Sequence, residues 1–327
     1  MVRGRGPGRS ARRPAVVVTV AALAATLLGC GAATSSPVRA QLRPSAGPRC
    51  AAGDIQGGGV ERVTGAGAPS TASAAPSAAS ARTLRTALTH ALAPVTRDCD
   101  GEFAVALLDT RSGASAAYGS RTYDTASIVK VGILAALLLK AQDERRGLTA
   151  KERDTATVMI EHSDNDAATA LWREIGRAPG LEAVNKRLGL SSTVGGAGGT
   201  WGLTRTTATD QVRLLSAVFA DGGTSATSGS ALTKTSQSYI RTLMTRIAAG
   251  QSWGVSAASD SGWALKNGWL QRTTTGLWDV NSVGQVTSGT HHYLVAVLSD
   301  GNATMPGGIA AVESAARTAV SSARAAG

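Results

Sequence analysis

Apolar residues are spaced for folding only in the second part of the chain. Between residues 31 and 79 the sequence consists mainly of Ala, Gly, Ser, Pro and Thr, with almost no large apolar side chains. A segment of this composition buries too little surface to offset the entropy it loses on ordering. From residue 82 onward, apolar patterns follow one another closely. The pattern therefore predicts a tether over residues 30–79 and a folded domain over residues 80–327.

Two apolar periodicities predict the elements of this domain. A spacing of four, as at Leu84, Leu88 and Leu92, is helical, and short apolar runs bounded by turn residues are typical of strands. The predicted helices include residues 82–93, 148–162, 166–175, 209–219, 239–248 and 309–326. The predicted strands are residues 102–109, 114–119, 262–268, 276–286 and 291–298. This order of elements indicates an α+β domain.

The most apolar stretch of the domain follows a serine and a lysine. Residues 131–139 form a run of nine apolar residues, too short to cross a bilayer, which predicts a buried central helix. Because residues three apart share a helix face, the Ser127 hydroxyl and the Lys130 amine are expected side by side in its first turn. Apolar packing and the helix dipole would lower the Lys130 pKa, so that this amine could accept the Ser127 proton.

A purely structural interpretation of these polar residues is also open. Thr125 or Ser127 can cap the helix, and Lys130 can extend its ammonium group to solvent. Ser-x-x-Lys is moreover expected by chance roughly once in a chain of this size. A second polar cluster, Ser163-Asp164-Asn165, directly precedes the helix predicted over residues 166–175, so it can be a capping turn.

The amino terminus has the features of an export signal. Five arginines in the first thirteen residues precede an apolar stretch, residues 15–28, and Cys30 follows it. Leu27-Leu28-Gly29-Cys30 is similar to a bacterial lipobox, which predicts a signal peptide over residues 1–29 and a lipid on Cys30. An uncleaved membrane anchor is the alternative. Without residues 1–29 the net charge falls from +11 to +6, and the remaining arginines are scattered, so no nucleic-acid partner is expected.

The other two cysteines of the chain are Cys50 and Cys99. In an oxidising compartment such a pair can form a disulfide, which would tie the tether to the start of the folded domain. Two free thiols are equally compatible with the sequence. No histidine has partners at metal-ligand spacing, so neither a metal ion nor another cofactor is expected.

Three motifs together resemble those of the penicillin-recognising serine hydrolases, the superfamily of class A β-lactamases and D,D-peptidases. Its pattern is Ser-x-x-Lys, then Ser-Asp-Asn, then Lys-Thr/Ser-Gly on a strand. Here residues 127–130, residues 163–165 and Lys266-Asn267-Gly268 follow in that order. The resemblance covers about residues 82–327. It implies an α/β/α sandwich with an antiparallel sheet flanked by helices. The helical subdomain would be reduced, because few residues separate the first two motifs.

The resemblance also implies a role for each motif residue. Ser127 would be the acylated nucleophile, Lys130 its proton acceptor, and Ser163 would pass a proton to the leaving nitrogen. The backbone N–H groups of Ser127 and Trp269 would form the oxyanion hole. The substrate-binding residues would be Asn165, Lys266, Asn267 and Gly268.

Two departures from the family pattern change the expected activity. Asn267 replaces the family's hydroxyl, although its amide can still donate to a carboxylate. Class A β-lactamases also use a glutamate after the second motif to activate the deacylating water. No Asp or Glu occurs in residues 183–209, and residues 195–201 read GGAGGTW. Since a lost general base costs roughly two to four orders of magnitude in rate, we expect acylation of Ser127 with slow turnover of β-lactams.

The sequence thus predicts an exported serine hydrolase, anchored by lipid to the outer face of the bacterial cytoplasmic membrane. It is expected to be a monomer that acts on a small β-lactam or a peptidoglycan-type substrate. A non-catalytic ligand-binding or sensor lipoprotein of the same fold is the alternative. A basic surface-binding protein in which the motifs are incidental is a third interpretation.

Overall fold

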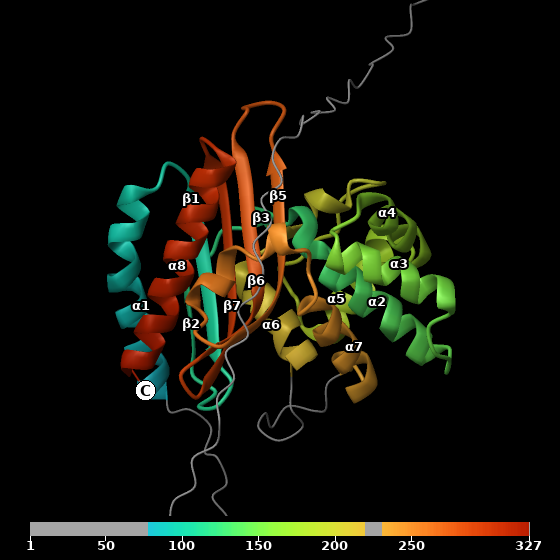
Figure 1. Ribbon diagram of the computed structural model, residues 1–327, viewed down its shortest axis with the longest axis horizontal. Helices are drawn as coiled ribbons and strands as arrows, with labels where there is room; N and C mark the ends of the chain where they lie inside the picture. Colours follow the sequence, from blue (N-terminus) through green and yellow to red (C-terminus); the bar gives the residue numbers. More distant parts are fainter. Residues whose placement is uncertain (1–77, 220–230, 327) are drawn as a thin grey trace, which may run out of the picture. The chain divides into compact units, whose positions relative to one another are not determined.

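The computed structural model describes residues 78–219 and 231–326, which form three layers (Figure 1). The middle layer is an antiparallel sheet of five strands: β1 (Glu102–Asp109), β2 (Ser115–Tyr118), β5 (Gly262–Gln271), β6 (Trp278–Ser288) and β7 (His291–Asn302). Their order across the sheet is β2-β1-β7-β6-β5, so β2 and β5 are the edges. Two short strands, β3 (Tyr123–Asp124) and β4 (Arg205–Thr206), pair separately.

Helices cover both faces of the sheet (Figure 1). One face carries α1 (Ala78–Asp98) and α8 (Met305–Ala326). The other side carries α2 (Val129–Asp143), α3 (Ala150–Glu161), α4 (Asn165–Glu174), α5 (Arg177–Leu188), α6 (Ala208–Phe219) and α7 (Lys234–Met244). Four 3-10 turns complete the described elements: η1 (Ala126–Ile128), η2 (Trp201–Leu203), η3 (Ala249–Gln251) and η4 (Gly254–Ala258). The predicted α+β class, with an antiparallel sheet flanked by helices, is confirmed.

The inner strands are apolar on both faces, which is why two helical layers can pack on them. Along β7, Val295 and Val297 belong to the core beneath α1 and α8, whereas Leu294 and Ala296 belong to the core beneath the other helices. Successive side chains of a strand point to opposite faces, so a continuous apolar run is what a doubly covered strand requires. Leu88 of α1 is fully buried against the first of these cores.

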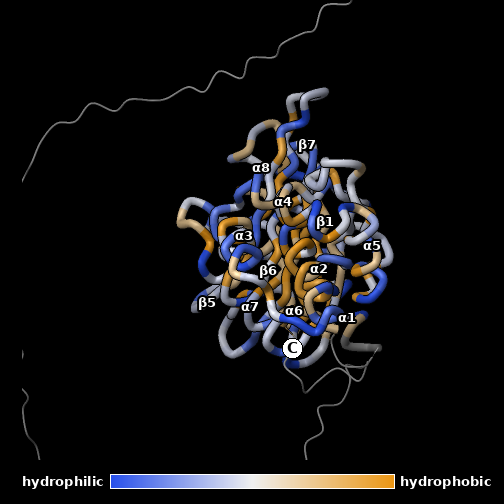
Figure 2. The backbone as a smooth tube through the Cα atoms, turned by 90° about the vertical axis from the view of Figure 1, so that its right-hand side faces the viewer, coloured by the Kyte–Doolittle hydropathy of each residue, from blue (hydrophilic) through white to orange (hydrophobic). Residues whose placement is uncertain are grey.

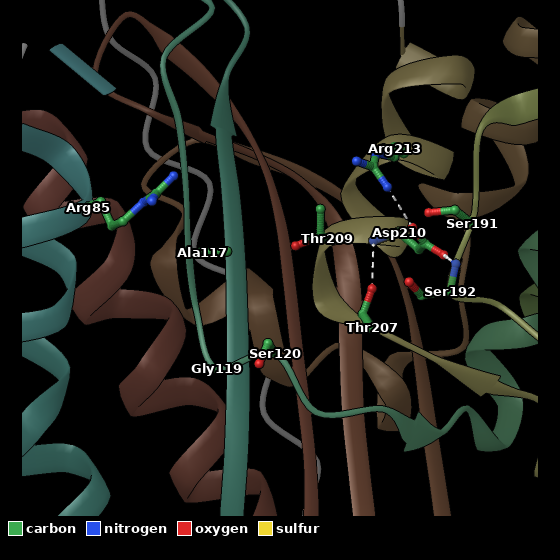
Figure 3. Close-up of a pocket in the computed structure, with 10 residues that line it drawn as sticks. All are labelled: Arg85, Ala117, Gly119, Ser120, Ser191, Ser192, Thr207, Thr209, Asp210 and Arg213. Carbon is green, nitrogen blue, oxygen red and sulfur yellow. Dashed lines mark hydrogen bonds and ion pairs between the residues drawn. The ribbon is translucent and has the colours of Figure 1, made fainter. Parts of the chain in front are cut away.

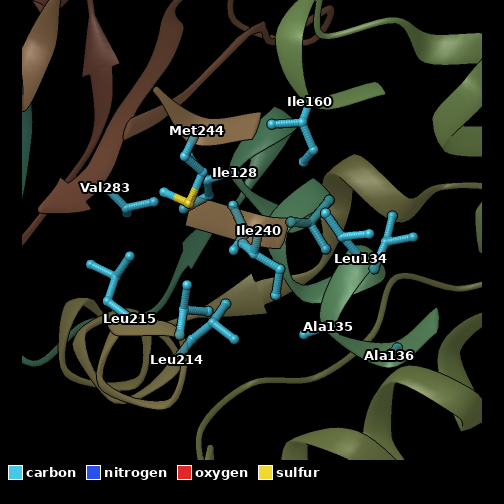
Figure 4. Close-up of a cluster of buried hydrophobic side chains, with 14 of the residues drawn as sticks. Ile128, Leu134, Ala135, Ala136, Ile160, Leu214, Leu215, Ile240, Met244 and Val283 are labelled. Atoms are coloured by element: carbon cyan, nitrogen blue, oxygen red, sulfur yellow. The ribbon is translucent and has the colours of Figure 1, made fainter. Parts of the chain in front are cut away.

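α2 is the centre of the larger helical layer. Twelve of its 15 residues are buried, as expected for the apolar run that predicted it. Side chains from distant segments meet in the same core, among them Ile128, Leu134, Ile160, Ile240 and Met244 (Figure 4). Colouring by residue hydropathy shows the same arrangement, because the hydrophobic residues are concentrated around α2 (Figure 2).

Several element boundaries differ from the sequence prediction for identifiable reasons. α5 was not predicted, because Gly176, Pro179 and Gly180 are residues that usually interrupt helices. Pro179 and Gly180 nevertheless lie in its first turn, where the N–H that proline lacks would have no partner within the helix. α7 begins five residues before the predicted segment at residue 239, since the Thr233 hydroxyl caps it by accepting from Ser236 N. α1 continues past Pro94 to Asp98.

Several predictions concern residues outside the described ranges. Cys30, Cys50, the signal peptide and nearly all of the tether lie there. Cys99 is half-buried at the end of α1, and burial raises the pKa of its thiol. None of the helices within residues 78–219 and 231–326 is long and apolar enough to span a bilayer.

Candidate active site

Ser127 lies in the 3-10 turn that leads into α2, one residue after a strained backbone position. Ala126 has a φ of +45°, in the left-handed region where a non-glycine residue costs about 1–3 kcal/mol. The turn is held from the sheet by Asn281, whose Nδ2 donates to the carbonyls of Asp124 at 2.9 Å and Thr125 at 3.1 Å. Ser127 therefore precedes α2 instead of lying in its first turn.

Neither Thr125 nor Ser127 caps α2. Thr125 occupies the N-cap position of η1, but its side chain makes no capping hydrogen bond, and its hydroxyl donates instead to the Gly202 carbonyl at 3.4 Å. The cap of α2 is Ile128, which has no hydroxyl to offer. Ser127 is half-buried and lines a cleft.

Lys130 is fully buried, so the interpretation that it extends to solvent is also wrong. Its Nζ donates to the Ser163 carbonyl at 2.5 Å, to Ser163 Oγ at 3.2 Å and to Asn165 Oδ1 at 2.9 Å. Burial lowers the pKa of Lys130 to about 8, although the nearby charge of Asp164 opposes this shift. Among the described residues, no hydrogen bond joins Ser127 Oγ to this amine.

Ser163 lies between two lysines. It has a φ of +57° and precedes Asp164, the cap of α4. The Asp164 carboxylate accepts from Ala167 N at 2.7 Å. The capping interpretation thus holds for Asp164. Ser163 Oγ accepts from Lys130 Nζ on one side and from Lys266 Nζ, at 2.9 Å, on the other. With both lone pairs occupied, the Ser163 O–H proton is free to donate elsewhere.

Lys266 and Asn267 point to opposite sides of β5. Lys266 is fully buried, and burial together with the charge of Lys130 holds its pKa well below the usual range. The Asn267 amide instead donates to the carbonyls of Gln251 at 2.7 Å and Trp253 at 2.9 Å. Those bonds occupy both its N–H groups. The expected donation from Asn267 to a substrate carboxylate therefore has no support in this arrangement.

Gly268 brings β5 against the turn of Ser127. A Cβ added at Gly268 would lie 2.7 Å from both Ser127 N and the Thr125 carbonyl oxygen, so only glycine fits there. Trp269 follows on the same edge strand and lines the same cleft as Ser127. Ser127 and Trp269, the two residues expected to supply the N–H groups of the oxyanion hole, thus line the same cleft.

The cleft beside Ser127 has a volume of about 500 Å³. Its large apolar lining residues include Trp201, Leu203 and Trp269, and Asn165 is one of its polar lining residues. Arg272 also lines it and forms ion pairs with Asp124 and, at 3.6 Å, Asp279. None of the described residues that line this cleft is acidic. The cleft therefore suits a ligand that carries an apolar group.

Trp201 is the neighbour of Lys130 that sequence reasoning missed. The Lys130 Nζ lies 4.9 Å from the centre of the Trp201 ring, a cation–π distance. The ring is held in place because its Nε1 donates to Thr169 Oγ1 at 3.2 Å. The signal in the sequence is the bulky Trp201 that ends the Gly-rich stretch of residues 195–201.

A second cavity, of about 520 Å³, lies away from Ser127 (Figure 3). Arg85 and Arg213 flank it, and Ser and Thr hydroxyls line much of the rest. Its one acid, Asp210, is buried and accepts from Ser192 N at 2.7 Å and from Arg213 Nη1 at 2.9 Å. It holds no nucleophile paired with a base, so it is not a candidate active site. In residues 78–219 and 231–326, no three His, Cys, Asp or Glu side chains are grouped to hold a metal ion.

A family model described as the beta-lactamase enzyme family matches residues 142–323. The match covers more than half of the chain, and the chain belongs to this family. It includes the motifs at Ser163 and Lys266 and begins after Ser127 and Lys130. The resemblance to the penicillin-recognising serine hydrolases, which the motifs indicated, is confirmed.

Solved structures share the fold at low sequence identity. TLA-1 extended-spectrum beta-lactamase has a TM-score of 0.64 and 16% identity, covering 73% of this chain and 98% of that one. A class A beta-lactamase from Bacteroides cellulosilyticus gives 0.62 and 16%, covering 74% and 98%. A mutant of PBP-A, solved as an acyl-enzyme complex with penicillin G, gives 0.59 and 18%, covering 72% and 95%. These likenesses show the fold alone.

A curated relative matches a smaller part of the chain. LppW of Mycobacterium tuberculosis, named as a predicted lipoprotein, is 32% identical over 110 residues. The match covers 33% of this chain and 35% of LppW, so the chain spans about a third of the length of this relative. LppW of Mycobacterium bovis matches to the same extent.

Proposed function

We propose that this chain is a serine hydrolase that forms an acyl-enzyme at Ser127. The observation that carries the proposal is the Ser163 hydroxyl held between Lys130 and Lys266, beside the cleft that Ser127 lines. A neutral Lys130 would take the Ser127 proton directly or through Ser163. Ser163 would then donate to the leaving nitrogen, and the N–H groups of Ser127 and Trp269 would bind the oxyanion.

The proposed substrates are β-lactams and cell-wall-type peptides or esters. Lys266 would attract the anionic end of such a substrate, with Gly268 allowing close approach of β5, and Asn165 would bind its amide side chain. The apolar walls of the cleft favour a substrate with an apolar substituent. We propose slow turnover of β-lactams, because none of the described lining residues of the cleft is an acid that could activate the deacylating water.

Intact mass spectrometry tests the acylation step. The purified protein is incubated with benzylpenicillin and its mass is followed over time, with Ser127→Ala as the control. We expect an adduct of one penicillin that appears on the wild type, persists, and is absent from Ser127→Ala. No adduct on the wild type would instead favour a non-catalytic ligand-binding lipoprotein, which would bind in the cleft without a covalent bond.

We further propose that the protein is exported and lipid-anchored through Cys30, with the tether separating the domain from the membrane. Support comes from the arginine-rich and apolar segments before Cys30 and from the name of LppW as a predicted lipoprotein. The proposed state of the domain is a monomer on the outer face of the cytoplasmic membrane.

A further inference from the structure

We infer that Trp201 is a water-excluding positioning residue, whose indole ring covers Lys130 and slows hydrolysis of the acyl-enzyme. The inference rests on the proposed acylation of Ser127 and adds to it a residue that determines the lifetime of the ester. It follows from the position of the ring over the amine, from the hydrogen bonds of that amine and from the way the loop of Trp201 is fixed.

Three hydrogen-bond acceptors and the Trp201 ring together surround the Lys130 amine. A lysine ammonium has three N–H donors. Here the acceptors are the Ser163 carbonyl, Ser163 Oγ and Asn165 Oδ1, and the Trp201 ring centre lies 4.9 Å from Nζ. A water molecule that approached Lys130 from the cleft would have to displace one of these neighbours. The amine is correspondingly fully buried.

The Trp201 ring and the loop that carries it are held in place by hydrogen bonds. Its Nε1 donates to Thr169 Oγ1 of α4, and Thr204 N donates to the Trp201 carbonyl at 3.1 Å. The Thr204 carbonyl in turn accepts from Thr125 N at 2.9 Å, two residues before the nucleophile. On the other side, Trp172 Nε1 donates to the Gly198 carbonyl at 2.9 Å. The loop is therefore joined both to α4 and to the turn of Ser127.

Hydrolysis of the ester needs a water molecule beside a base, and this arrangement keeps water away from the base. The water oxygen must bond to the acyl carbon, a base must take one water proton, and the bond from that carbon to Ser127 Oγ must break as the oxygen regains a proton. Asp164, an acid next to Ser163 in the sequence, does not serve as this base, because its carboxylate accepts the hydrogen bond that caps α4. Lys130 is the base at hand, and Trp201 covers it. The ester should consequently persist.

The test separates release of the acyl group from its formation. The wild type, Trp201→Ala and Trp201→Phe are loaded with benzylpenicillin, freed of excess drug and followed by intact mass. We expect Trp201→Ala, once loaded, to release the adduct at least about tenfold faster than the wild type, since water gains access to a base. Trp201→Phe, which keeps an aromatic face over the amine, should restore slow release.

Two matched variants distinguish an effect of the Trp201 ring on release from an effect of the loop that carries this ring. Trp172→Phe removes the bond to the Gly198 carbonyl without uncovering Lys130, and release should stay slow. Thr169→Val frees the Trp201 ring without removing it and should accelerate release, which keeps the test decisive if Trp201→Ala does not fold. Equal acceleration by Trp172→Phe, or unchanged release from the Trp201 and Thr169 variants, would overturn the inference. Absence of any adduct on the wild type would instead refute the proposed acylation.

Discussion

Two lysine side chains are buried around one serine hydroxyl, and this is the most unusual feature at the scale of single residues. Burial penalises the charged form of each, and the proximity of Lys130 lowers the pKa of Lys266 further. No carboxylate among the described residues forms an ion pair with either lysine. A neutral amine is thus available near physiological pH, which is the protonation state that activation of Ser127 requires.

The rate of acylation should depend on pH through Lys130. Since its pKa is about 8, the neutral fraction should rise about tenfold per pH unit below that value and level off above it. We expect the second-order rate constant for acylation by benzylpenicillin to follow this curve, measured by quenched intact-mass time courses. A flat profile between about pH 6 and 9 would argue against Lys130 as the base.

The same lowered pKa affects stability with a definite sign. The folded protein loses the Lys130 proton near pH 8, whereas the unfolded chain keeps it up to about 10.5. The unfolded state therefore binds more protons in this window, and the contribution of Lys130 to the free energy of unfolding should increase as the pH rises from 8 to 10.5. Urea unfolding of Lys130→Met, which lacks the titrating group, supplies the reference.

Asn267→Ala should impair stability more than chemistry. The substitution leaves the half-buried carbonyls of Gln251 and Trp253 without their donor, at a cost of about 1–3 kcal/mol in the free energy of unfolding. Urea denaturation measures this loss, and acylation by penicillin should stay within about threefold of the wild type. A large loss of acylation at unchanged stability would show instead that the amide binds substrate.

At the scale of elements, the nucleophile is placed by the edge strand β5 passing over the turn η1. Gly268 permits that contact, and Asn281 of β6 holds the turn from the next strand. The sheet thus positions the reacting groups, while α2 supplies Lys130 and α4 supplies Asn165.

Gly268→Ala should therefore abolish rapid acylation. A methyl group at this position would collide with Ser127 N and the Thr125 carbonyl and push the oxyanion-binding N–H out of place. Loss of one such donor costs about 100-fold or more in rate. Gly262→Ala on the same strand is the matched control, because its Cβ would meet only Thr287 Oγ1 at 3.8 Å. Similar acylation rates for the two variants would contradict the proposed positioning.

Elements with a strong apolar period were predictable from the sequence, whereas contacts between distant segments were not. The run over residues 131–139 identified α2, and the three motifs identified residues that do meet in space. The contact of Trp201 with Lys130 joins η2 to α2, which are far apart in the sequence, and it follows no period. The orientation of Asn267 was predictable in principle, because neighbours on a strand face opposite sides and Lys266 already faces Ser163.

At the scale of the whole molecule, the domain is one sheet with a helical layer on each side, and membership in the beta-lactamase family accounts for this architecture. We propose that the segments before the domain, which are outside the described ranges, decide where it acts.

Cys30→Ser should release the protein from membranes. A lipid chain adds about 0.8 kcal/mol of binding for each CH₂ group buried in the bilayer, so its loss removes the anchor. We expect wild type in the membrane pellet of an expressing bacterium and Cys30→Ser in the soluble fraction, with the pellet unchanged by a high-salt wash. Wild-type protein recovered in the aqueous phase without lipid would contradict the anchor.

The position of α1 has a consequence for the size of the substrate. The chain enters the domain at Ala78, and α1 packs on α8 and on β2, the edge of the sheet opposite to β5 (Figure 1). The entry point thus lies across the sheet from Ser127 and does not crowd the mouth of the cleft. For the proposed hydrolase, we therefore expect that a long polymer, and not only a small antibiotic, can reach Ser127.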